Sequence, residues 1–190
     1  MARLDYASSD TPAGPDGPII DRIRTRRGGT LRPLDLMLLH SPPLADGWND
    51  FLGAVRSGTI LADDVRELAI LRVAALNDAQ YEWDAHEPLG QAGGLTDSDL
   101  AVLRGEPRSD RLEPRLAAAL AYTDAMTAEV SVPEDVFDSL RRHFNEREVV
   151  ELTVTVGAYN LVSRVLVALE VGQEEPPSSP NTGGEDQERA

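Results

Sequence analysis

Apolar residues recur at helical spacing along most of the chain and divide it into a series of amphipathic or fully apolar segments. No segment shows the strict alternation of apolar and polar residues that is typical of a strand. The chain is therefore predicted to be all-α, with about seven or eight helices. We expect them over residues 33–39, 43–55, 62–76, 79–92, 96–103, 112–130, 133–143 and 145–169.

Both ends of the chain lack this pattern. Residues 1–30 are rich in Gly, Pro, Asp and Arg, which predicts an extended N-terminal arm. Residues 173–190 form a polar, acidic tail with nothing to bury, so we expect it to be disordered. The helical domain is accordingly predicted over residues 31–172.

Composition narrows the class of protein. The 190 residues are enough for one domain, and the net charge of −15 argues against binding to nucleic acid. Neither a secretory h-region nor a run of 18 apolar residues is evident, so we expect a cytoplasmic protein without a membrane span. The chain contains no cysteine and no lysine, which excludes thiol chemistry and a lysine Schiff base.

A carboxylate and an imidazole lie one helical turn apart in the predicted helix 79–92. Glu82 precedes His86 by four residues, so both side chains share a face. The pair is either an ordinary helix-surface pair or an acid/base pair. The flanking aromatics Tyr81 and Trp83 predict burial, and burial would raise the pKa of Glu82 toward a useful range.

Two further charged residues stand in the apolar helix 62–76. Glu67 is either a first-turn residue favoured by the helix dipole or a carboxylate facing a pocket. Arg72 lies on an apolar face and needs either a carboxylate partner, the more common case, or an anionic ligand.

The last helix carries a polar stripe of Thr153, Gly157, Asn160 and Arg164, with Tyr159 beside it. Such a stripe lines either a wet cavity or a polar contact between subunits. We expect no metal, because His86 with Glu82 or Glu67 is only a weak ligand set.

Several ordered segments together resemble the carboxymuconolactone decarboxylase family, which includes the AhpD-like alkylhydroperoxidases. The matching segments are residues 64–74, 81–86, 91–95 and 157–164, and the resemblance covers about residues 31–172. It implies a compact all-α, AhpD-like fold that assembles into homotrimers or homohexamers.

The resemblance also bears on the chemistry. The peroxidase branch of the family uses a Cys-x-x-Cys pair, and Ala79 and Glu82 stand at the corresponding positions here. Thiol peroxidase activity is therefore excluded. The decarboxylase branch carries a glutamate four residues before the histidine, as in this chain, and needs neither a metal nor an organic cofactor.

Three hypotheses follow. The first is a cofactor-independent enzyme that decarboxylates a small, anionic, carboxylated or enolisable metabolite with proton transfer. His86 would be the acid/base group, Glu82 would orient it or act as the second acid/base group, and Glu67 would complete the relay. The expected substrate contacts are Arg72 or Arg164 for a carboxylate, with Tyr81, Trp83, Tyr159 and Asn160 shaping the pocket.

The second hypothesis keeps the fold but changes the reaction to that of a cyclase, dehydratase or isomerase of specialised metabolism. The third is a non-catalytic, oligomeric, ligand-binding protein in which the Glu82–His86 pair is structural.

Overall fold

The computed structural model describes residues 2–8, 16–107 and 112–172, and in these residues the chain forms nine α-helices and no strand. The helices are Gly17–Arg26 (α1), Pro33–Leu38 (α2), Pro42–Ser57 (α3), Asp63–Leu76 (α4), Gln80–Gly93 (α5), Asp97–Leu103 (α6), Pro114–Ala128 (α7), Glu134–Arg141 (α8) and Glu146–Leu169 (α9). The all-α class is thus confirmed, and every helix predicted from the pattern is present. The tail predicted to be disordered lies outside the described residues.

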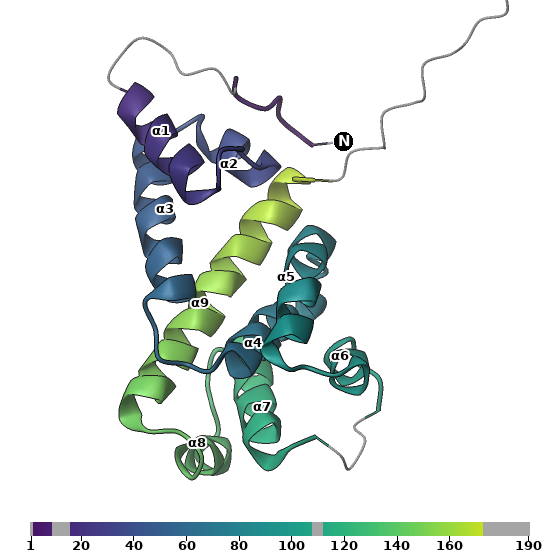
Figure 1. Cartoon of the computed structure of the whole chain (residues 1–190). Helices are drawn as coiled ribbons and strands as arrows, with labels where there is room; N and C mark the ends of the chain where they lie inside the picture. The colour runs from purple at the N-terminus through teal and green to yellow at the C-terminus, as the bar shows by residue number, and fades with distance from the viewer. Residues whose placement is uncertain (1, 9–15, 108–111, 173–190) are drawn as a thin grey trace, which may run out of the picture.

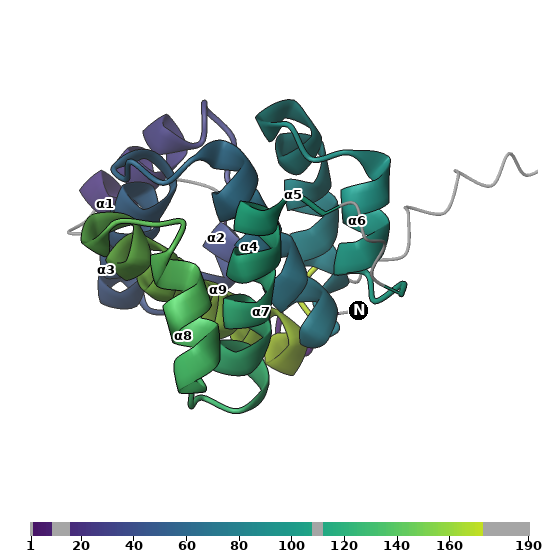
Figure 2. The ribbon, with the colours of Figure 1, turned by 90° about the horizontal axis from the view of Figure 1, so that it is seen from below.

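Helix α4 is the centre of the fold. It contacts α5, α6, α7 and α9, and Figure 2 shows it enclosed by its neighbours. Val65, Leu68, Ile70 and Val73 are completely buried although they point in different directions around the helix. A helix covered on nearly every side can be apolar on nearly every side, which explains the sequence of α4.

Helices α5 and α9 pack against α4 and carry most of the polar residues discussed below. α5 continues through Pro88 to Gly93 and is followed by Gly94, whose φ of 111° favours glycine. α9 begins at a capping box in which Asn145 and Glu148 each accept a hydrogen bond from the other's backbone N–H. These ends fix the register of both helices.

The N-terminal region differs from the extended arm predicted from its composition. Residues 17–26 form helix α1, which packs on α3 and buries Ile20 and Ile23 in a small apolar cluster with Leu39 and Ala45. The surrounding Gly, Pro and Arg residues obscure this short apolar face in the sequence. Figure 1 shows α1 and α2 beside α3 at one end of the molecule.

Residues 2–8 form no helix but are held by backbone contacts. The amide of Arg3 donates to the carbonyl of Leu169 at 3.0 Å, and the amide of Ala7 donates to the carbonyl of Leu36 at 3.3 Å. The amide of Gly172 donates to the Tyr6 hydroxyl at 3.1 Å. The segment therefore connects the C-terminal end of α9 to α2.

Helix α9 is long and apolar enough, by length and composition alone, to cross a membrane. A core helix of a globular protein passes the same test. Here α9 contacts α3, α4, α5, α7 and α8, and Leu152, Val156 and Tyr159 are completely buried. Its packing in the core accounts for its apolar sequence.

Candidate active site

A small cavity of about 30 Å³ lies where α3, α5 and α9 meet the α1–α2 region. It is lined by Arg27, Arg32, Leu34, Arg56, Tyr81, Glu82, His86, Tyr159, Val162 and Leu166. Two of the three residues predicted as catalytic, Glu82 and His86, thus line one cavity. The third, Glu67, lies directly behind His86.

Four side chains form a hydrogen-bonded chain along one wall. The Arg56 Nε–H donates to the Tyr159 hydroxyl at 2.7 Å, and that hydroxyl lies 3.3 Å from Nε2 of His86. On the other side of the ring, Nδ1 lies 2.7 Å from Oε2 of Glu67. Because a carboxylate oxygen accepts hydrogen bonds, the ring proton belongs on Nδ1. Nε2 then accepts a hydrogen bond from the Tyr159 hydroxyl, which also lines the cavity.

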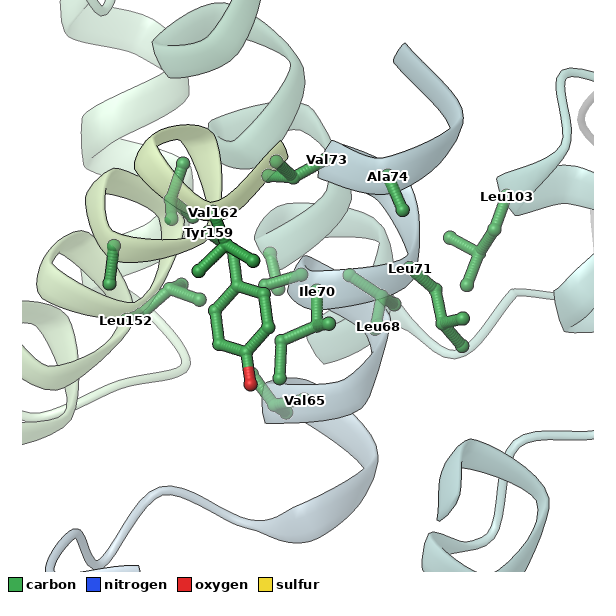
Figure 3. Close-up of a cluster of buried hydrophobic side chains, with 14 of the residues drawn as sticks. Val65, Leu68, Ile70, Leu71, Val73, Ala74, Leu103, Leu152, Tyr159 and Val162 are labelled. Carbon is green, nitrogen blue, oxygen red and sulfur yellow. The ribbon is translucent and has the colours of Figure 1, made fainter. Parts of the chain in front are cut away.

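Burial changes the pKa values of His86 and Tyr159. His86 is 6% exposed, and burial lowers its pKa against the opposing hydrogen bond and charge of Glu67. The ring is therefore neutral near pH 7. Tyr159 is completely buried, which raises its pKa to about 12 against the opposing effect of Arg56. Figure 3 shows the Tyr159 ring among the apolar side chains with its hydroxyl at the margin of the cluster.

Glu82 is the second titratable group on the cavity. It is 2% exposed, and burial raises its pKa to about 8 although Ser163 and Arg56 act in the opposite direction. This confirms the rise predicted from the sequence. The Ser163 hydroxyl donates to Oε2 at 3.0 Å, whereas Oε1 is buried without a hydrogen-bond partner among the described residues. Glu82 is therefore a mostly protonated acid with one free oxygen at neutral pH.

The structure divides the two roles that the sequence left open for Glu82. Glu67, nineteen residues away in the chain, orients His86, whereas Glu82 contacts Ser163 instead. Glu82 and His86 share a helical face as predicted. However, no hydrogen bond joins their side chains in the described part of the chain.

Of the predicted substrate contacts, Tyr81 and Tyr159 line the cavity and the others do not. Arg72 binds both oxygens of Asp124, at 2.6 and 3.3 Å, so it has the carboxylate partner considered above. Arg164 is exposed and donates to Asn160, and Asn160 itself donates to Thr127. Their hydrogen-bonding groups are thus engaged on the flank of α9.

Trp83 lies on a different hollow, of about 340 Å³, formed by the end of α4 and the start of α5. The Arg104 guanidinium lies 3.9 Å from the centre of its indole ring, a cation–π contact. Trp83 is therefore predicted correctly as a buried residue, but the structure does not bring it to the cavity with His86.

Sequence reasoning missed Arg56, Ser163, Arg27 and Arg32. Ser163 lies four residues after Tyr159, so their shared helical face is a signal that could have identified it. Arg27 and Arg32 lie in the connection between α1 and α2, Arg56 lies in α3, and none of them carries a comparable signal. Among the described residues, no group of three or more His, Asp or Glu side chains could hold a metal ion.

The fold and the site together define an all-helical domain with a buried Glu–His–Tyr chain and a second buried carboxylic acid beside it. Residues 42–125 match the model of the carboxymuconolactone decarboxylase family. The chain is therefore similar to this family over that segment, contains no cysteine and has an AhpD-like fold.

Two other proteins are similar to this chain in sequence. One is a protein of unknown function from Agrobacterium tumefaciens, for which an AhpD antioxidant role has been suggested. Its crystal structure is known, and its sequence is 26% identical to this chain. The superposition covers 75% of this chain and 97% of the Agrobacterium chain, with a TM-score of 0.65. The uncharacterised protein YdfG of Bacillus subtilis (strain 168) is 26% identical over 106 residues, which is 55% of this chain and 72% of YdfG.

A second similar structure shows the fold alone. It is the debrominase Bmp8 in complex with 2,3,4-tribromopyrrole, 16% identical, with a TM-score of 0.73. The comparison covers 92% of this chain and 94% of the debrominase.

Proposed function

We propose that the chain is a cofactor-independent acid/base enzyme resembling carboxymuconolactone decarboxylase. It would act on a small carboxylated or enolisable metabolite in the cytoplasm, as a homotrimer or homohexamer. The observation that carries the proposal is the pairing of a neutral His86 with a protonated Glu82 on one cavity. Titratable groups whose environments move their pKa values apart are typical of acid/base sites.

The proposed reaction assigns one role to each group. The bond between the substrate carboxyl carbon and its neighbour breaks, CO₂ leaves, and the electron pair moves into a conjugated carbonyl to give an enolate. Glu82 donates its proton to the enolate carbon and is reprotonated by water. Where solvent first protonates the enolate oxygen, the neutral His86 Nε2 accepts that proton as Glu82 protonates the carbon, and then releases it to solvent. Glu67 holds the ring for this role.

The second candidate is an isomerase or cyclase on the same site. A base and an acid on one cavity can remove a proton from one atom and supply a proton to another without loss of CO₂. The debrominase of the same fold supports a role outside decarboxylation. Product analysis separates the two candidates, because only the first releases CO₂.

Substitution of the two groups tests the proposal. Turnover of carboxylated lactones would be followed in D₂O with wild type, His86→Gln, Glu82→Gln and the exposed control His143→Gln. Because a positioned proton-transfer group contributes about 10²–10⁴-fold, we expect losses of that size in the first two variants and none in the control. Deuterium should enter the product carbon in the wild type.

The opposite result has a distinct signature. If His86→Gln turns over a genuine substrate normally but melts at a lower temperature, His86 is structural and the acid/base proposal is wrong. That outcome would favour a non-catalytic, ligand-binding protein.

A further inference from the structure

Arginine side chains gather on one side of the cavity in a chain whose net charge is −15. Arg27 and Arg32 come from the end of α1 and the start of α2, and Arg56 comes from α3. Arg26 lies behind them and is within electrostatic reach of all three. This concentration of positive charge is therefore a local feature, opposite in sign to the whole chain.

Only one of the four arginines is neutralised by a carboxylate in the described part of the chain. Arg27 donates through Nε and Nη2 to Asp35 at 3.1 and 2.9 Å, and both side chains are almost fully buried. Arg56 donates Nε–H to the neutral Tyr159 hydroxyl. Arg32 has neither an ion pair nor a side-chain hydrogen bond to any described residue.

Arg26 shows the consequence of this surplus. It donates to Oδ1 of Asn49, and its Nη2 is buried without a partner among the described residues. Burial and then the charges of Arg27 and Arg56 lower its pKa. A partly buried cationic cluster favours an anionic partner, because removing charge from water is costly unless it is paired.

The nearby carboxyl groups do not meet this need. Glu82 is mostly protonated at neutral pH, since its pKa is raised to about 8. Glu67 contacts His86 and Arg66. The arginines that line the cavity therefore provide both excess positive charge and hydrogen-bond donors.

We propose that Arg32 and Arg56, supported by Arg27, bind a carboxylate of the substrate that does not itself react. The guanidinium fork matches the two oxygens of a carboxylate. A cavity of about 30 Å³ has room for roughly two water-sized groups, so a carboxylate fits and the rest of the substrate extends past the exposed Arg32.

The charge pattern indicates why the bound carboxylate is a spectator. Arginines stabilise the carboxylate anion more than neutral CO₂, so holding the departing group would oppose its loss. The statement that the bound carboxylate does not react rests on the proposed function. The statement that the arginines bind a carboxylate does not. It predicts a substrate with a second acid group for decarboxylation, or a single one for isomerisation.

Both Arg27 and Arg32 precede the residues that match the family model, 42–125. The α1–α2 region would therefore determine which acid this chain accepts. In this proposal, Arg32 and Arg56 bind the carboxylate, a role that the sequence analysis gave to Arg72 or Arg164.

Binding to the full chain can be measured without knowing the substrate. Maleate, its dimethyl ester and inorganic phosphate would be titrated calorimetrically into wild type, Arg32→Gln, Arg56→Gln, Arg56→Lys and the exposed control Arg142→Gln. Loss of a charged hydrogen-bonding partner should weaken maleate binding at least about tenfold in both Gln variants. The control should match wild type, Arg56→Lys should recover part of the affinity, and the ester should not bind.

The proposal is overturned if wild type binds no maleate at millimolar concentration, if the ester binds equally well, or if both Gln variants bind like the control. Binding of phosphate but not maleate would overturn the carboxylate assignment. His86→Gln separates this inference from the proposed function: retained maleate binding with lost turnover supports both. Retained turnover refutes only the catalytic role of His86.

Discussion

Glu82 and His86 lie one turn apart on α5, yet burial moves their pKa values in opposite directions. The shared cause is the cost of holding a charge in an apolar environment, which favours the neutral form of both groups. An acid that keeps its proton and a base that stays unprotonated therefore coexist at neutral pH. The cavity gains a proton donor and a proton acceptor from the same physical effect.

Glu82 should make the stability of the folded chain depend on pH. Its pKa rises from 4.5 to about 8 on folding, so the folded state binds the extra proton between these values. This contribution to stability is fully present below about pH 4.5 and is lost as pH rises toward about 8. We expect Glu82→Gln to remove a slope of up to about 1.4 kcal/mol per pH unit, measured by urea unfolding.

The comparison uses the difference between wild type and Glu82→Gln at each pH, which cancels the other titrating groups. His86 acts in the opposite direction over an overlapping range, since its lowered pKa removes stability as pH falls below about 6.5. Parallel wild-type and variant curves from pH 5 to 8 would show that Glu82 titrates normally.

At the scale of elements, the closeness of α4 and α5 positions the site, because it brings Glu67 to His86. Gly90 of α5 permits this approach. A Cβ at that position would lie 2.9 Å from Cδ1 of Leu71 and 3.1 Å from Cδ1 of Leu95. The missing side chain is thus part of the packing between the two helices.

Gly90→Ala should therefore destabilise the fold. Overpacking costs about 1–3 kcal/mol, which exceeds the gain of about 0.5–1 kcal/mol in helix propensity. The matched control is Gly47→Ala in α3, where a Cβ meets no atom within 4 Å and a small stabilisation is expected. Thermal unfolding of both variants tests the prediction, and equal melting temperatures would contradict it.

At the scale of the whole molecule, one face of α9 presents apolar side chains outward. Val150, Val154 and Leu161 are 61%, 41% and 47% exposed, and the exposed Gly157 lies between them on the same face. Their spacing of four, then seven residues keeps them in one stripe. A stripe of this kind on a core helix is typical of an interface between copies of a chain.

We therefore expect the wild type to sediment as a trimer or hexamer and Leu161→Glu to shift toward the monomer. The reason is that a charge placed in an apolar interface loses its hydration without gaining a partner. Leu44→Glu on α3, where the leucine is 67% exposed, is the control. A monomeric wild type, or equal dissociation of both variants, would contradict this interface.

Some features of the fold and the site could be predicted from the sequence, and others could not. It located the helices, because helical spacing and caps such as Asn145–Glu148 are local. It also indicated that Arg72 needs a partner, since a buried arginine does, but it did not identify Asp124 as that partner. It did not recognise α1, whose burial depends on contact with α3 and is not apparent in an arm rich in Gly, Pro and Arg.

The sequence by itself determined that the chain is helical, that it lacks thiol chemistry and that Glu82 and His86 share a face. Only the tertiary structure decided that Glu67 orients His86, that Ser163 binds Glu82 and that arginines from α1 to α3 surround the cavity. The physical reason is that helical spacing fixes which side chains share a face. The partner of a buried polar group depends instead on which helix packs across from it.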